Sequence, residues 1–125
     1  MILLDTQVVY WSMVEPERLG RRARSLIAST PSRFVSSITH VEFAIKQTKG
    51  KLHVPADLPA SLAAAGFEAL AFSDAHAQGI RDLPTLAGHD PFDRMLLAQA
   101  HVGGLSLVTS DRHLLEFAGT VDATQ

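Results

Sequence analysis

Short apolar runs alternate with amphipathic stretches along this chain of 125 residues. The apolar runs predict strands at residues 2–4, 34–35, 67–72 and 105–109, and an edge strand around residue 121. The longer amphipathic stretches predict helices at residues 12–27, 37–49, 57–65, 74–81, 91–103 and 112–117. Residues 84–88 predict a loop. This alternation favours a three-layer α/β/α fold, in which helices cover both faces of a short, mostly parallel sheet.

The helix predicted at residues 91–103 begins with two carboxylates. Asp90 precedes Pro91, which is typical of an N-cap followed by proline at the first helical position. Asp93 lies in the first turn, where the helix dipole favours negative charge. One interpretation is local, with Asp93 reaching back to the Asp90 amide as in a capping box. The other is that both carboxylates belong to a polar site, and this stretch alone leaves both interpretations open.

Glu42 is the acidic residue of the helix predicted at residues 37–49. Ile38, Val41 and Ile45 fall within one narrow arc of that helix, and Glu42 lies on the edge of the same arc. A carboxylate on a core-facing stripe is costly to bury unless it has a partner. Glu42 therefore either extends to solvent or binds a nearby backbone amide, or it points into a polar site beneath the core.

Two further carboxylates follow predicted strands. Asp5 comes directly after residues 2–4, and Asp111 comes two residues after the strand at 105–109, where it also fits an N-cap of the next helix. In parallel α/β sheets, ligands bind outside the carboxyl ends of the strands. We expect Asp90 and Asp93 at the same edge as Asp5 and Asp111, with Glu42 available from a neighbouring helix. These four carboxylates would repel one another unless a divalent cation bound between them. Oxygen ligands without cysteine or clustered histidine favour Mg²⁺ or Mn²⁺.

Composition narrows the class of protein. The length fits one domain, residues 1–125, and 46% apolar residues can fill its core. No apolar run is long enough to span a membrane, and the N-terminus lacks the pattern of a signal peptide. The absence of cysteine excludes disulfides and fits the cytoplasm. With a net charge of −2, a nucleic-acid partner would need a local basic surface.

Several segments together carry a resemblance to a known family. They are LLDT at residues 3–6, SITHVEFAIK at 37–46, GKL at 50–52, HDPFDRMLLAQA at 89–100 and LVTSD at 107–111. In this order and spacing the sequence resembles the PIN-domain ribonucleases, specifically the VapC-type toxins of type II toxin–antitoxin pairs. The resemblance covers nearly the whole chain and implies the PIN-like version of the three-layer fold.

The resemblance also implies an activity, which is metal-dependent hydrolysis of RNA phosphodiester bonds with Mg²⁺ or Mn²⁺ as cofactor. The acidic quartet of the family, both catalytic and metal-binding, carries over onto Asp5, Glu42, Asp93 and Asp111. The residues expected to support this quartet are Thr6, Asp90, Thr109 and Ser110. We further expect basic residues to balance phosphate charge, namely Lys46, Lys49, Lys51 and Arg94. The implied partners are an RNA substrate, a cognate VapB-type antitoxin whose tail occupies the acidic cleft, and a second copy of the chain.

Two other functions compete with the nuclease. A receiver-type signalling module is also a Mg²⁺-binding α/β domain of this length, but it needs adjacent acids after the first strand and a late lysine. Here Asp5 is followed by Thr6 and Gln7, and no lysine follows Lys51. The second alternative is a PIN-like RNA-binding module without catalysis, which a nuclease assay distinguishes.

Overall fold

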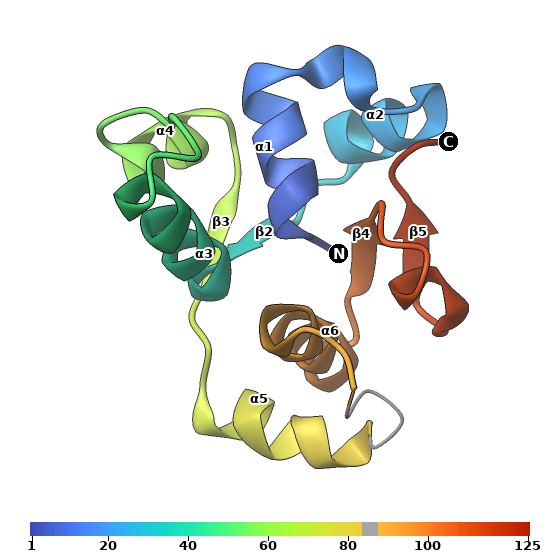
Figure 1. Cartoon of the computed structure of the whole chain (residues 1–125). Helices are drawn as coiled ribbons and strands as arrows, with labels where there is room; N and C mark the ends of the chain where they lie inside the picture. The colour runs from blue at the N-terminus through green and yellow to red at the C-terminus, as the bar shows by residue number, and fades with distance from the viewer. Residues whose placement is uncertain (84–87) are drawn as a thin grey trace.

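The structure is a computed structural model that describes residues 1–83 and 88–125 (Figure 1). The loop predicted at residues 84–88 lies outside the described residues except for Gly88. A five-stranded sheet runs through the molecule in the order β3-β2-β1-β4-β5, and every neighbouring pair is parallel. The strands are β1 (Ile2–Leu4), β2 (Arg33–Ser36), β3 (Glu68–Leu70), β4 (Ser106–Thr109) and β5 (Thr120–Asp122). The predicted edge strand around Val121 is confirmed as β5, whereas β3 is shorter than predicted.

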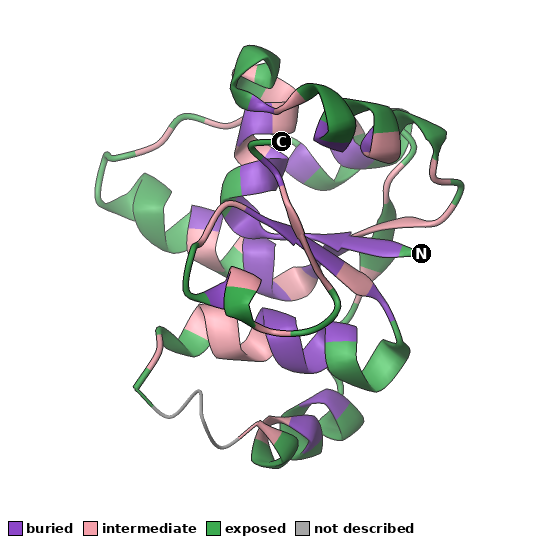
Figure 2. Ribbon diagram, turned by 90° about the vertical axis from the view of Figure 1, so that its right-hand side faces the viewer, coloured by how far each residue is buried: buried purple, intermediate pink, exposed green. Residues whose placement is uncertain are grey.

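Strand β1 lies at the centre of the sheet and is buried on both faces. Leu3 is opposite Phe34 of β2 and Leu107 of β4. Because successive side chains of a strand point to opposite faces, Ile2 and Leu4 pack into one apolar cluster and Leu3 into the other. The sheet therefore separates two cores, and Figure 2 shows the buried strands between the helical layers.

Helices cover both faces of the sheet, which confirms the predicted α/β/α layers. The core on one face is built with α1 (Thr6–Val14), α2 (Arg21–Ser29), α3 (Ser37–Thr48) and α4 (Leu58–Ala64). On the other face α6 (Pro91–Gly103) packs against the sheet, and α5 (Asp74–Gly79) packs against α6. Short 3₁₀ turns complete the chain at η1 (Pro16–Arg18), η2 (Ile80–Asp82) and η4 (Leu114–Glu116).

The single helix predicted at residues 12–27 is wrong. Helix α1 begins earlier, at Thr6, because the Asp5 side chain caps it. The chain then turns at Pro16, whose ring cannot continue a helix, and α2 starts only after Gly20. The Gly20 amide instead donates to the carbonyl of Ala123 at 2.9 Å, so the break also holds the C-terminal segment.

The buried face predicted for α3 is also wrong in part. Ile38 is buried, but Val41 and Ile45 are 45% and 39% exposed. Thr39 and Phe43 are buried instead. At about 100° per residue, the face that packs inward is rotated by roughly one residue from the predicted arc. Glu42 consequently lies inside the protein-facing arc rather than on its edge.

The remaining helices agree more closely with the predictions. Asp57 caps α4, and Ser73 caps α5 in a capping box with His76. The last helix is shorter than expected, since only the 3₁₀ turn η4 forms in the segment 112–117. Over the two described stretches, no helix has the length and apolar character needed to cross a membrane.

A buried polar network around Gln99 of α6 links this helix to strand β2 and to helix α5. Ser36 donates to Oε1 of Gln99, and both residues are fully buried. The Gln99 amide nitrogen lies 3.4 Å from Nδ1 of His76 and 3.4 Å from the carbonyl oxygen of Ala71. Gln99 thereby ties α6 to β2 and to the start of α5 inside an otherwise apolar layer.

Candidate active site

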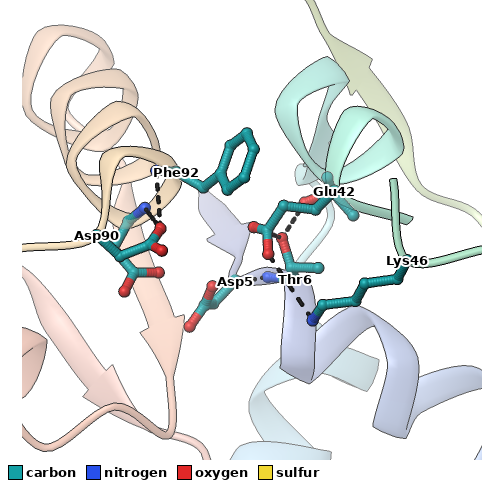
Figure 3. A network of polar contacts seen from close by, with 8 residues as sticks. Asp5, Thr6, Glu42, Lys46, Asp90 and Phe92 are labelled. Carbon is teal, nitrogen blue, oxygen red and sulfur yellow. Dashed lines mark hydrogen bonds and ion pairs between the residues drawn. The ribbon is translucent and has the colours of Figure 1, made fainter. Parts of the chain in front are cut away.

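The predicted acidic residues gather at the carboxyl edge of the sheet. Asp5 and Asp111 follow the adjacent parallel strands β1 and β4, whose carboxyl ends lie side by side. The N-terminus of α6 brings Asp90 and Asp93 to the same edge, and α3 brings Glu42 (Figure 3). The convergence predicted from the sequence is found, while the catalytic roles of these residues stay a prediction.

Asp5 is the most buried of these carboxylates, with 6% of its surface exposed. Its Oδ1 accepts the backbone amide of Thr6 at 2.7 Å, and its Oδ2 accepts the hydroxyl of Thr109 at 2.7 Å. Burial raises the pKa of Asp5, and these two hydrogen bonds oppose the rise because they stabilise the charged form. The side chain is therefore held in one orientation by groups from α1 and β4.

Glu42 is held by a second threonine. The Thr6 hydroxyl donates to Oε1 of Glu42 at 2.7 Å and lies 3.0 Å from the hydroxyl of Thr39. Lys46 lies one turn further along α3, with its Nζ 3.9 Å from Oε2 of Glu42 (Figure 3). Burial raises the pKa of Glu42, the Thr6 and Lys46 contacts oppose that rise, and the nearby Asp5 adds to it.

The two carboxylates at the start of α6, Asp90 and Asp93, make different contacts. Asp90 is the N-cap, and its Oδ1 accepts the amides of Phe92 at 2.8 Å and Asp93 at 3.2 Å (Figure 3). The reciprocal bond of a capping box is not formed, and the described part of the chain offers the Asp93 carboxylate no hydrogen-bond donor. Asp93 instead faces the other acids.

The other acids also act on the pKa of Asp93. Burial is the main cause that raises its pKa from 3.8 to about 7, and the charges of Asp5, Asp90, Asp111 and Glu42 all raise it further. A carboxyl group in this state is destabilised when it ionises unless a cation lies beside it. This crowding is the clearest physical sign that the site is built for a positively charged ligand.

The N-cap of η4 is His113, without a side-chain cap bond, so the prediction of Asp111 as the cap of the last helix is wrong. Asp111 lies two residues before His113. Its Oδ1 accepts the amide of His113 at 2.8 Å, which stabilises the turn before η4. Its own amide donates to the Thr109 hydroxyl at 3.0 Å, and the same hydroxyl donates to Asp5. Thr6 and Thr109 thus contact the acids as predicted. Ser110 is half-buried and forms no hydrogen bond with them among residues 1–83 and 88–125.

The carboxylate and hydroxyl oxygens at this edge fit a divalent cation in donor chemistry. Within the described chain no three acidic or histidine side chains are close enough together to form a direct metal site. Mg²⁺ retains several waters and uses only one or two carboxylates directly, so a site partly mediated by water matches this spacing. Among the charges that raise the pKa of Asp93, that of Asp5 has the largest effect, so a cation could bind between these two carboxylates.

The basic residues expected near the site differ in position. Lys46 contacts Glu42 and lowers the pKa of Asp5, so it lies at the edge of the acidic group. Lys49 and Lys51 are exposed beyond the end of α3. Arg94 forms no ion pair with an acid in the described residues, and its buried Nε has no hydrogen-bond partner there. Pairing of Arg94 with a carboxylate is therefore not observed.

Sequence reasoning missed three residues that lie at or beside the acids. Thr39 is fully buried and contacts Thr6; its position three residues before Glu42, on the same side of α3, was the available signal. His89 and His113 line the hollow next to Asp93 and Asp111. Neither histidine has a metal-ligand spacing in the sequence, and only the fold places them together.

Comparison with known proteins agrees with this geometry. The sequence matches the PIN domain family over residues 2–120. It is 31% identical over 115 residues to "Ribonuclease VapC22" of Mycobacterium tuberculosis, which covers 90% of this chain and 88% of that protein. The chain belongs to the PIN domain family. Within this family, the chain is similar in sequence to a VapC ribonuclease.

Solved structures share the fold at lower identity. A toxin–antitoxin complex from Klebsiella pneumoniae contains a chain with a TM-score of 0.69 and 21% identity, covering 98% of both chains. VapBC2 from Rickettsia felis, bound to a DNA fragment from its promoter, gives a TM-score of 0.68 and 18% identity over 97% of this chain and 96% of that one. These likenesses support the three-layer PIN fold over the whole chain.

Proposed function

We propose that this chain is the ribonuclease toxin of a toxin–antitoxin pair and that it hydrolyses RNA phosphodiester bonds with a divalent cation, Mg²⁺ or Mn²⁺. The observation that carries the proposal is the crowding of carboxylates around Asp93, whose pKa of about 7 reflects burial among four other acids. The similarity to a VapC ribonuclease supports RNA as the substrate.

In this proposal Asp5 and Asp93 ligate the cation, and Asp111 and Glu42 complete the site directly or through water. When bound, the cation would lower the pKa of a water molecule and neutralise charge on the phosphate. Thr109 and Thr6 position the ligands, since each donates a 2.7 Å hydrogen bond to a carboxylate. Asp90 keeps Asp93 in place by capping the first turn of α6.

The decisive experiment measures RNA cleavage by purified protein with and without Mg²⁺. Asp93→Asn keeps the size of the side chain and removes the charge, so we expect it to abolish Mg²⁺-dependent cleavage without loss of the fold. Asp82→Asn is the matched control, because Asp82 is exposed in η2 and its carboxylate contacts only His101 among the described residues. The control variant should cleave at the wild-type rate.

Three outcomes would contradict the proposal. Cleavage by pure Asp93→Asn protein near the wild-type rate would remove Asp93 from the catalytic group. Cleavage that survives a chelator would remove the cation. A well-folded wild-type protein that binds RNA but leaves it intact would favour the PIN-like binding module without catalysis.

The proposed partners are a VapB-type antitoxin and a second copy of this chain. The structural relatives are described as VapBC or toxin–antitoxin complexes, which supports an antitoxin partner here as well. Val41 and Ile45 form an exposed apolar surface on α3 next to Glu42, which is compatible with a protein contact beside the acids. Co-expression with the product of a neighbouring short reading frame should yield a complex without ribonuclease activity. Light scattering of the free toxin should give the mass of a dimer.

A further inference from the structure

Three of the acidic residues, Asp90, Asp93 and Asp111, also line a hollow in the protein surface. The hollow has a volume of about 380 Å³ and is lined by Gly88, His89, Asp90, Asp93, Asp111 and His113. This size lies near the lower end of small-molecule sites, which span about 300–1,000 Å³. Two imidazole rings, those of His89 and His113, also line this hollow and have no part in the proposed hydrolysis.

The two imidazoles belong to a small aromatic array. The His89 and His113 rings are nearly perpendicular, at 81°, with centroids 5.9 Å apart. His89 also contacts Phe117, with ring centroids 6.2 Å apart and ring planes at 77°. Phe117 packs against the apolar core beneath β4, so the array has a fixed base. His113 itself is exposed, and its ring is therefore open to a ligand.

The residues that line the hollow favour a nucleobase of an RNA strand over its phosphate. The lining residues include no lysine or arginine, so a phosphate would be held there only through the cation that Asp93 and Asp111 are proposed to bind. A nucleobase is uncharged and flat, and it stacks well on aromatic rings, including histidine. Proteins that bind single-stranded RNA use this combination of an exposed ring and a splayed base.

We propose that this hollow, which is lined by His89, His113, Asp90, Asp93 and Asp111, receives the nucleobase next to the scissile phosphate and stacks it on the His113 ring. This inference rests on the proposed ribonuclease function and adds a specificity site to it. His113 is then a substrate-positioning residue: stacking places the flanking nucleotide so that the phosphate reaches the acids. The His89 ring contacts the His113 ring, and Phe117 in turn contacts His89.

The test uses the full chain and a single-stranded RNA oligonucleotide that the wild-type protein cleaves. His113→Ala should raise KM about tenfold with little change in kcat, since one stacking contact is lost. His113→Phe should restore KM, because phenylalanine stacks but neither binds a metal nor carries a proton. An oligonucleotide that is abasic at the flanking position should abolish the difference between wild type and His113→Ala.

The matched control is His101→Ala. His101 is exposed on α6, eight residues beyond Asp93, which is about 12 Å along the helix axis. It should keep the wild-type KM. The proposal is overturned if His113→Ala behaves as wild type, or if His113→Phe is as defective as His113→Ala, which would indicate a polar or metal-binding role.

A binding experiment separates this proposal from the proposed function. Oligonucleotides carrying 2-aminopurine at successive positions are mixed with Asp93→Asn protein, and stacking quenches their fluorescence. We expect quenching at one position, and its loss in the His113→Ala double variant. If the wild type cleaves no RNA but this pattern appears, the base site stands while the ribonuclease proposal fails. Equal fluorescence with and without His113 overturns the base site even in an active enzyme.

Discussion

The hydroxyl of Thr109 donates a 2.7 Å hydrogen bond to Oδ2 of Asp5, joining two residues that are 104 positions apart in the chain. The same hydroxyl accepts the amide of Asp111 at 3.0 Å. Thr109 is fully buried at the carboxyl end of β4, next to β1 in the sheet. One side chain thus fixes the relative positions of two of the acids proposed to bind the cation.

Replacing Thr109 by valine tests this arrangement. Valine preserves the shape of the side chain but removes the donor to Asp5 and the acceptor for the Asp111 amide. We expect ribonuclease activity to fall by about 10–100-fold, the range typical of residues that orient metal ligands. Thr109→Ser keeps the hydroxyl and should retain most of the activity. Initial rates over a Mg²⁺ titration measure both variants, and a valine variant with wild-type rates and Mg²⁺ dependence would contradict the prediction.

Binding of Mg²⁺ should stabilise the folded protein. A ligand that binds only the native state adds RT ln(1 + [L]/Kd) to the free energy of unfolding, or about 2.7 kcal/mol at a hundredfold excess over Kd. Thermal unfolding of the wild type at pH 8 should therefore shift upward as Mg²⁺ is added and return with a chelator. Asp93→Asn should show little shift, because it lacks a proposed ligand. An equal shift in both proteins would place the bound cation elsewhere.

The metal-free protein should lose stability as the pH rises from about 4 to about 7. The pKa of Asp93 is raised in the folded state from 3.8 to about 7, so over this interval the folded state binds a proton that the unfolded state has released. The stabilisation is complete below pH 4 and is lost once the pH passes the folded-state value.

The comparison with Asp93→Asn isolates this effect. In the presence of chelator the variant should be more stable than wild type at pH 8 by on the order of 1 kcal/mol, after allowing for solvent screening of a half-buried group. At pH 4 the two should be nearly equal. Urea unfolding at both pH values measures the difference in the free energy of unfolding between the two proteins. If the wild type is the more stable protein at pH 8, the prediction is contradicted.

The buried Gln99 network should matter for stability rather than for catalysis. Gln99→Leu fills a similar volume but leaves the fully buried Ser36 hydroxyl without an acceptor for its proton, although it still accepts the Ile38 amide. We expect a loss of about 1–3 kcal/mol in the free energy of unfolding, as for other buried polar groups left unpaired. Gln78→Leu on the exposed side of α5 is the matched control and should change it little. Urea unfolding measures both variants, and an unchanged Gln99→Leu protein would mean that the network contributes nothing.

Most of the fold follows from short-range patterns. Short apolar runs predict the strands, and Asp90 followed by Pro91 predicts the start of α6, because capping involves only neighbouring amides. Pro16 and Gly20 were visible helix breakers, but the apolar positions around them suggested one continuous helix. The Gly20 amide bonds to Ala123, a contact that no local pattern contains.

Some features of the candidate site likewise follow from the sequence, and others only from the tertiary structure. The sequence by itself determined that Asp5 and Asp111 reach the carboxyl edge of the sheet, because a residue that follows a parallel strand must lie there. Only the tertiary structure decided that α3 turns Glu42 inward toward Thr6, that Thr109 holds Asp5, and that His113 lies beside the acids. These relationships depend on side chains many positions apart, and so does the raised pKa of Asp93, which results from burial and from charges on three other segments.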